Sequence, residues 1–288
     1  MMVSLPGVLP KLLAPKGVAG RDKVVRAFFR YFASGLPHDA GQLTKARYTS
    51  LKGRVSDEDL ARAECVNGLA ILSNSAPTAF WTIFHTFSDI EVLEEIRAQL
   101  IAITTIEPPT GSHVEKRTIQ ISRLRELPIF SSLIQETTRY RARGTGPRMA
   151  MEDVVLSDDS RQYHIEKGAV VMLAHNAMHL DKVTWGDTAD RFDARRFLPG
   201  SKIPTNAFRG FGGGVNACPG KSFAVAEIAA LVSMLALRFD ITPVTGEWTE
   251  PGQDLSNMGR ESTPPVKKTW VDIVPRSGME EVAWSFEM

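Results

Sequence analysis

The stretch Phe211-Gly212-Gly213-Gly214-Val215-Asn216-Ala217-Cys218-Pro219-Gly220 decides the fold of this chain. Its consecutive glycines permit a tight turn and a close approach of the backbone to a flat or bulky group. Pro219 suits the first position of a helix, and the Ala-, Leu- and Val-rich residues 222–238 predict a buried helix. We therefore expect Cys218 at a helix N-terminus, where unpaired N–H groups and the helix dipole favour a thiolate.

Several other sites built on such a loop do not fit the spacing. A phosphate-binding loop requires glycine where Val215 stands, and a cysteine phosphatase requires arginine where Ala224 stands. A tetrahedral metal site requires further cysteine or histidine ligands nearby, and the stretch has none. A single thiolate among glycines, with an aromatic residue seven positions earlier, suits haem iron.

This stretch resembles the haem-binding signature of the cytochrome P450 family, Phe-Gly-x-Gly-x-(Arg/His)-x-Cys-x-Gly. The matching residues are Phe211, Gly212, Gly214, Cys218 and Gly220. The resemblance implies haem b as cofactor, with Cys218 as the axial thiolate ligand of the iron and the other residues at the cofactor. Asn216 departs from the pattern, because most members carry there a base that pairs with a haem propionate; we keep it among the cofactor-binding candidates.

A second element lies in the helix predicted over residues 128–143. Glu136 and Arg139 are three residues apart and so share a helix face. Such a pair is common on surface helices, but beside the Cys218 loop it matches the family's Glu-x-x-Arg element. Arg196 takes the place of the third member. One carboxylate bridging two guanidinium groups is expected to fix the later loop against the helix, which is a structural role.

A long helix is predicted from a Ser56 cap to about His85, interrupted at Pro77. Proline cannot donate a hydrogen bond to the carbonyl group one turn earlier and so opens that turn. In the family the corresponding helix crosses the haem face. The resemblance therefore makes Asn74 and Thr78, beside the opened turn, the candidate catalytic residues.

The residues around Pro77 also indicate a branch of the family. Most monooxygenases carry an acid–threonine pair here. The branch with prostacyclin synthase and sterol 7α-hydroxylase is what this helix resembles, through Asn74, Pro77, Phe80 and Trp81. Members of that branch also carry asparagine at the position of Asn216. The competing interpretation is that Asn74 is a satisfied polar group inside a helix.

Arg148 and a histidine pair have weaker interpretations. Arg148 stands where many family members direct a base to a haem propionate, although a solvated arginine explains it nearly as well. His175 and His179 are four residues apart, as in helical zinc sites, but Asn176 stands where zinc peptidases need glutamate. The family's connecting loop is the preferred interpretation of this pair.

The amino-acid composition is that of a globular protein, and it does not indicate a particular class of binding partner. The 288 residues carry a net charge of +1, which gives no reason to expect nucleic acid, and two cysteines, too few for a disulfide framework. No apolar run approaches the roughly 18 residues of a membrane span.

Residues 154–156 and 162–165 predict a hairpin that 168–173 continues, and 239–244 and 266–274 predict further strands. The expected fold is mainly α with a small β region.

The resemblance covers the C-terminal part of the family's fold, so residues 1–288 are expected to form one partial P450 domain. A membrane-surface contact, and a place on the cytoplasmic face of the endoplasmic reticulum, are expected only through the N-terminal part of a full-length member. The first hypothesis is a haem-thiolate monooxygenase that uses O2 and electrons from NADPH–cytochrome P450 reductase. Its substrate would be a small hydrophobic molecule of secondary metabolism, of sterol, terpenoid or polyketide type. The alternatives are an isomerase or dehydratase of the prostacyclin-synthase type and a truncated, non-catalytic remnant.

Overall fold

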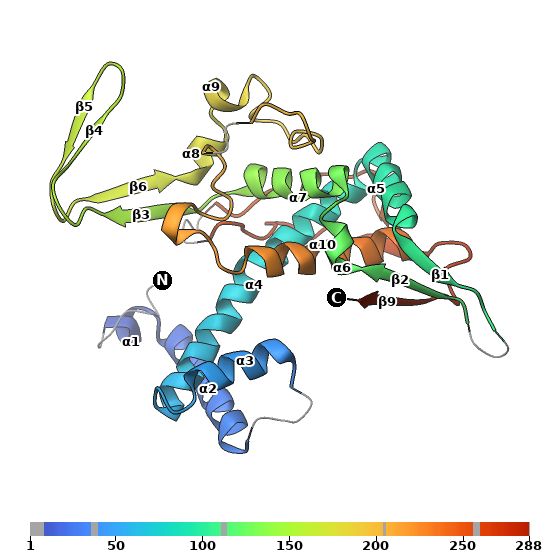
Figure 1. The fold of residues 1–288 in the computed structure, drawn as a ribbon, viewed down its shortest axis with the longest axis horizontal. Helices are drawn as coiled ribbons and strands as arrows, with labels where there is room; N and C mark the ends of the chain where they lie inside the picture. Colours follow the sequence, from blue (N-terminus) through green and yellow to red (C-terminus); the bar gives the residue numbers. More distant parts are fainter. Residues whose placement is uncertain (1–8, 36–39, 111–113, 204–205, 256–259, 288) are drawn as a thin grey trace. The chain divides into compact units, whose positions relative to one another are not determined.

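The computed structural model describes residues 9–35, 40–110, 114–203, 206–255 and 260–287 (Figure 1). The chain forms two compact units, Met1–Leu72 and Ser73–Met288. Helix α4 (Asp57–Phe87) begins in the first unit and ends in the second. Across the described ranges, no helix has both the length and the apolar character that crossing a bilayer requires.

The first unit consists of helices α1 (Leu9–Leu13), α2 (Pro15–Ala33), α3 (Gln42–Leu51) and the start of α4. The ring of Phe32 on α2 is buried and lies 5.2 Å from the ring of Tyr48 on α3. An ion pair between Arg47 and Glu64 joins α3 to α4. Ser56 caps α4, as predicted, because its hydroxyl oxygen accepts a hydrogen bond from the backbone N–H of Asp59 at 3.1 Å.

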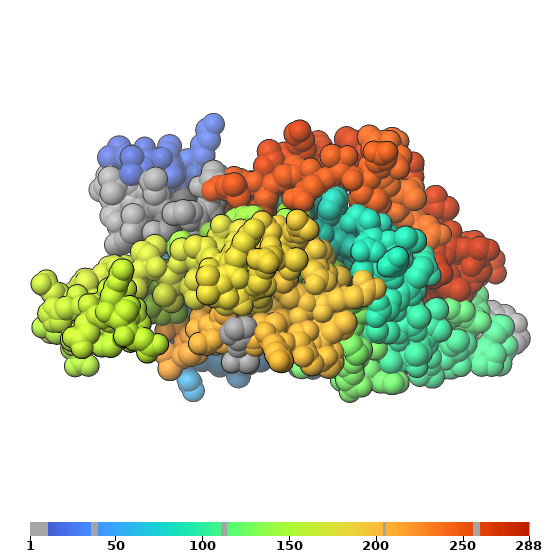
Figure 2. All heavy atoms as spheres, turned by 90° about the horizontal axis from the view of Figure 1, so that it is seen from above, coloured from blue at the N-terminus to red at the C-terminus, as the bar shows by residue number. Residues whose placement is uncertain are grey.

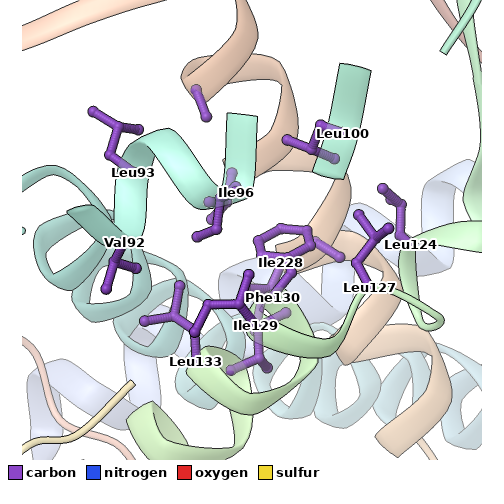
Figure 3. Packing of buried hydrophobic residues seen from close by; sticks show 14 of the residues in the cluster. Val92, Leu93, Ile96, Leu100, Leu124, Leu127, Ile129, Phe130, Leu133 and Ile228 are labelled. Atoms are coloured by element: carbon purple, nitrogen blue, oxygen red, sulfur yellow. The ribbon is translucent and has the colours of Figure 1, made fainter. Parts of the chain in front are cut away.

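The core of the second unit lies between three helices (Figure 3). These are α5 (Ile90–Ala102), α7 (Pro128–Arg141) and α10 (Lys221–Arg238), with the short α6 (Ile121–Leu124) beside them. Their buried faces carry branched and aromatic side chains at helical spacing, among them Val92, Ile96, Leu100, Ile129, Phe130, Leu133 and Ile228. Burying one such side chain stabilises the fold by roughly 1.5–3 kcal/mol, so this cluster fixes the helices that carry the site.

Within the described ranges, the strands form four small sheets. The largest has the order β1-β2-β9, with β2 antiparallel to β1 and parallel to β9. The other sheets are the antiparallel pairs β3–β6, β4–β5 and β7–β8. The bounds are β1 (Thr104–Glu107), β2 (Lys116–Gln120), β3 (Thr145–Met149), β4 (Val154–Ser157), β5 (Gln162–Ile165), β6 (Val170–Ala174), β7 (Phe239–Pro243), β8 (Val271–Pro275) and β9 (Ala283–Glu287).

The β4–β5 hairpin lies at one end of the second unit, yellow-green in Figures 1 and 2. The prediction of a mainly helical fold with a small β region is confirmed. The predicted continuation of the hairpin by residues 168–173 is wrong, because β6 pairs with β3, with Val170 opposite Met149. The strand predicted from Val266 begins only at Val271, since the N–H groups of Val266 and Lys267 donate to the carbonyls of Gly252 and Pro251.

Pro219 is not the first residue of a helix. Helix α10 begins at Lys221, and Pro219 lies in the turn before it. The N–H of Lys221 donates to the carbonyl of Cys218 at 3.3 Å, so the cysteine stands one turn ahead of the helix. The predicted interruption of the long helix at Pro77 is wrong, because α4 runs without a break from Asp57 to Phe87 with Pro77 inside it. The remaining short elements are α8 (His175–His179), α9 (Lys182–Trp185) and the 3-10 turn η2 (Gly214–Asn216).

Candidate functional site

A buried ion pair on α7 is the most enclosed part of the site. Glu136 and Arg139 are three residues apart on the helix, and both side chains are 0% exposed. The Nε and Nη2 groups of Arg139 donate to the two carboxylate oxygens of Glu136, each at 2.7 Å. This two-pronged contact uses the planar fork of the guanidinium group, which lysine cannot reproduce.

The segment after α9 closes on the same carboxylate. The Nε of Arg196 donates to both oxygens of Glu136 at 3.1 Å, and the backbone N–H of Asp193 donates to Oε1 at 3.0 Å. One residue later, the N–H of Phe197 donates to the hydroxyl oxygen of Ser132 on α7 at 2.9 Å. The structure therefore brings Glu136, Arg139 and Arg196 together, and we call these three residues the clamp.

The guanidinium group of Arg139 also fixes the segment that contains α8. Its Nη1 donates to the carbonyl groups of His179 and Ala189, and its Nη2 donates to that of Arg191 at 3.2 Å. These carbonyl dipoles surround a buried cation, which would otherwise be costly to remove from water. The clamp therefore fixes the last residue of α8 as well as the segment carrying Arg196.

His179 connects this buried layer to the cysteine loop. Its side chain is 0% exposed, and Nε2 accepts a hydrogen bond from the backbone N–H of Arg209 at 2.8 Å. Burial lowers the pKa of His179 to about 3, helped by the positive charges that His175 and Arg139 can present. The imidazole is therefore neutral at pH 7 and available as an acceptor.

The cysteine loop holds its own shape through backbone hydrogen bonds. The N–H of Cys218 donates to the carbonyl of Phe211, and the N–H of Gly212 to that of Arg209, both at 2.8 Å. Gly212 has a φ of +71°, and a Cβ there would lie 2.9 Å from the carbonyl oxygen of Asn216. Glycine is thus required at 212 by conformation and by space.

The outer side of this loop is open. Cys218 and Asn216 are exposed, and Val215 is fully exposed at 101%. A Cβ at Gly220 would lie 3.8 Å from the sulfur of Cys218, so glycine keeps the space beside the thiol clear. The ring of Phe211 lies under the Nζ of Lys221, 5.6 Å from it. Gly214, at the start of η2, has a φ of +59°.

Asn74 is tied to a segment that sequence reasoning did not connect with it. Its Oδ1 accepts hydrogen bonds from the backbone N–H groups of Glu261 (3.1 Å) and Ser262 (3.4 Å). The hydroxyl group of Thr78 donates to the carbonyl of Asn74 at 2.8 Å, within the helix. Both candidate catalytic side chains therefore make contacts with the backbone.

Arg148 and His175 lie on neighbouring elements. Arg148 is half-buried on β3 and donates to the carbonyl of Pro147 at 2.9 Å. The Nδ1 of His175 is hydrogen-bonded to Oε2 of Glu261 at 2.8 Å. Since His179 is hydrogen-bonded to Arg209, each histidine of the pair has its own protein partner. In the described part of the chain, no group of three or more His, Cys, Asp and Glu side chains is placed to hold a metal ion.

A buried network around Arg141 escaped sequence reasoning. Its guanidinium group bonds to the Nε2 of His85 at 2.9 Å and to Glu250 at 2.6 Å, and lies 3.7 Å from the centre of the Trp81 ring. The ring of His85 stacks on Phe192 at 3.6 Å. Burial, and then the charge of Arg141, lower the pKa of His85 well below its usual value. No local pattern indicates this network, because its members are spread from 81 to 250.

Comparison with known proteins identifies a family and several relatives. The family model described as Cytochrome P450 matches residues 46–266. Cytochrome P450 monooxygenase nodJ of Hypoxylon pulicicidum is 32% identical over 299 residues, covering 100% of this chain and 58% of that protein. Cholesterol 7-alpha-monooxygenase of Cricetulus griseus is 28% identical, covering 73% of this chain and 44% of its own length.

The chain spans about half the length of the curated relatives it matches. The match to the family model runs from before α4 to beyond the cysteine loop, and so includes the clamp. The chain therefore belongs to the cytochrome P450 family.

Proposed function

We propose that this chain provides the cysteine-ligand part of a haem-thiolate monooxygenase that oxidises a small hydrophobic molecule. One observation carries the proposal. Cys218 presents an exposed thiol on a loop whose ends are joined by the hydrogen bond from its own N–H to the carbonyl of Phe211. The backbone is fixed while the sulfur stays accessible, which a single-thiolate ligand of a large cofactor needs.

The donor set fits haem rather than a bare metal ion. Haem iron brings four ring nitrogens with it and needs only one or two ligands from the protein. Within the described ranges Cys218 has no partner ligands in a metal-binding group, which suits this requirement. When bound, haem would supply an oxidising centre that uses O2, two electrons and two protons to place one oxygen atom in a C–H bond and release the other as water.

The residues around Cys218 would position and shield the ligand. Gly212 and Gly214 allow the loop to turn, and Gly220 keeps the thiol free of a neighbouring side chain. Phe211 would pack beside the cofactor, and Asn216 and Arg148 would supply polar contacts at its edge. The clamp would not touch the cofactor; it would hold the segments on which the loop rests.

The proposed substrate is a sterol, terpenoid or polyketide, and the proposed electron donor is NADPH–cytochrome P450 reductase. Cholesterol 7-alpha-monooxygenase is named for action on a sterol, which supports this substrate class for the present chain. The proposed location is the cytoplasmic face of the endoplasmic reticulum, as expected for a partner of that reductase.

The carbon-monoxide spectrum of the reduced protein tests the thiolate assignment. The 288-residue chain, loaded with haem and reduced, should show the red-shifted Soret band of thiolate ligation. Cys218→Ala should abolish the band, whereas Cys65→Ala, which removes the only other cysteine, should keep it. A band retained in Cys218→Ala, or absent from the unaltered chain, would refute the proposal.

A haem-thiolate isomerase or dehydratase is the second candidate, favoured by the bonding of Asn74 and Thr78. The Oδ1 of Asn74 already accepts two backbone N–H groups, and the Thr78 hydroxyl donates within its helix. Asn74 and Thr78 are therefore not arranged like the acid–threonine pair that delivers protons in most monooxygenases. Turnover that needs NADPH and reductase supports the monooxygenase; turnover of a peroxide substrate without them supports the isomerase.

A further inference from the structure

Helix α8 carries a histidine that the proposed function leaves without a role. We propose that His179 is a positioning residue for the cysteine loop, acting through a neutral Nε2 that accepts the backbone N–H of Arg209. Its effect on the loop stands on the hydrogen bonds alone. Its effect on haem ligation rests on the proposed function.

The hydrogen bond lies where the loop begins. The N–H of Arg209 donates to His179 at 2.8 Å, and the carbonyl of the same residue accepts the N–H of Gly212 at 2.8 Å. The loop then closes at its far end through the N–H of Cys218 and the carbonyl of Phe211. The imidazole therefore fixes the peptide group from which the first turn of the loop starts.

The ring of His179 has little freedom to move away from this contact. It stacks on Phe208 with centroids 5.6 Å apart and planes 17° apart, and meets Trp185 edge-on at 6.0 Å. Its own carbonyl group accepts from Arg139 of the clamp. A buried ring held by two aromatic neighbours and by its own backbone presents Nε2 in one direction.

The bond requires one protonation state. Nε2 can accept only if it carries no proton, so the proton of the neutral ring lies on Nδ1, for which the described residues provide no hydrogen-bond partner. The groups that face the ring are His175 on the same helix, Arg139 on α7 and Arg209 on the loop, and the two arginines are cations. These charges and burial oppose a second proton, so the acceptor persists across the physiological pH range.

A histidine that merely fills space would behave differently from an acceptor. Phenylalanine keeps the ring and its stacking but removes Nε2, whereas glutamine places an amide oxygen near the position of Nε2. We would compare His179→Phe and His179→Gln, with His164→Phe on the exposed strand β5 as the matched control. All variants would be made in the full 288-residue chain.

Hydrogen exchange at the backbone amide of Arg209, followed by NMR, is the direct readout. His179→Phe should exchange about tenfold faster at this amide, since one hydrogen bond is lost. His179→Gln should restore most of the protection, and His164→Phe should match the unaltered protein. Equal protection of Arg209 in His179→Phe and the unaltered chain would overturn the proposal.

A second measurement tests the proposal even if the His179→Phe variant fails to fold. Nitrogen-15 NMR of the unaltered protein should show a protonated Nδ1 and a bare Nε2 at His179, and a protonated Nε2 would also refute the proposal. The carbon-monoxide spectrum separates this inference from the proposed function. If the unaltered chain lacks the thiolate band but protects Arg209 through His179, the proposed function fails and the positioning role stands.

Discussion

The clamp and the cysteine loop serve one site and are built in opposite ways. In the clamp, Glu136 and Arg139 are 0% exposed and every oxygen of the carboxylate accepts hydrogen bonds from charged donors. In the loop, Cys218 is exposed, and the hydrogen bonds that close the turn join backbone N–H and carbonyl groups of the loop. The charged residues of the site thus act on the fold, while the residue offered for ligation is left free of packing.

This difference separates stability from chemistry. A buried ion pair adds little by itself, because desolvation offsets its attraction, but removing one partner leaves a charge buried without compensation. An exposed thiol has no such coupling to the fold. The two regions meet at His179, which accepts from the loop with its ring and from the clamp with its carbonyl.

The largest expected effect comes from breaking the clamp. Glu136→Ala should lower the free energy of unfolding of the second unit by about 3–5 kcal/mol, because Arg139 stays buried without its carboxylate. All five tryptophans lie in this unit, so fluorescence in urea reports its unfolding. The control Glu95→Ala removes an exposed partner of Arg195 and should cost less than about 1 kcal/mol. Equal costs for the two variants would show that the buried clamp is no more strongly coupled to the fold than an exposed ion pair.

The second-largest effect should come from acidification, which weakens the connection that His179 makes between the clamp and the cysteine loop. His179 has a folded pKa of about 3, below its unfolded value of roughly 6.5, so the unfolded chain takes up a proton first as pH falls. The contribution of His179 to the free energy of unfolding is fully present above pH 6.5 and should fall by about 2 kcal/mol between pH 6.5 and 5. His85, whose pKa is also lowered, acts in the same direction.

The variant His179→Gln isolates this contribution, because glutamine does not titrate. Urea unfolding of both proteins at pH 7 and pH 5 gives the comparison. The unaltered chain should lose more stability than the variant on going to pH 5. Equal losses in the two proteins would show that His179 is protonated in the folded state or exposed to water.

Local patterns predicted the elements of the site better than its connections. The Glu-x-x-Arg spacing placed Glu136 and Arg139 on one helix face, and the glycines predicted a tight turn before Cys218. Both features depend on neighbours within a few residues. The catalytic and cofactor-binding roles of Asn74, Thr78, Asn216 and Arg148 remain predictions.

The contacts that sequence reasoning did not foresee join distant segments. Asn74 bonds to residue 261, and Arg141 bonds to His85 and Glu250. Asn74, His85 and Arg141 lie on helices, and only the packing of the core brings them to their partners. The strand pairing of β3 with β6 was misjudged for the same reason, since alternation marks a strand but does not identify its partner.

Within the loop, glycine substitution should cost less than breaking the clamp. Gly212→Ala combines a positive φ with a Cβ 2.9 Å from the Asn216 carbonyl, and should destabilise by about 2 kcal/mol. Gly168→Ala is the control. Its φ is +85°, but a Cβ there meets no atom of the described residues within 4 Å, so a destabilisation of only about 1 kcal/mol is expected. Thermal unfolding would measure both, and a larger loss at Gly168 would argue against close packing in the loop.

A smaller effect is expected at Asn74. Asn74→Ala removes the acceptor of two backbone N–H groups at 261 and 262, and should cost about 1 kcal/mol. Asn74→Asp keeps an acceptor oxygen and should cost less. Urea unfolding checks the pair of variants, and an Ala variant as stable as the unaltered chain would show that these amides find water instead.

The smallest effect on stability should come from the residue with the largest chemical role. Cys218→Ser replaces an exposed sulfur by oxygen and leaves the hydrogen bond from residue 218 to the Phe211 carbonyl in place. Surface substitutions of this kind stay within about 0.5 kcal/mol, so the cofactor-free chain should unfold at an unchanged urea concentration. The same variant should lose the thiolate band in the carbon-monoxide spectrum. A loss of stability as large as that of Glu136→Ala would mean that the thiol is packed into the fold, and the contrast between the two regions would fail.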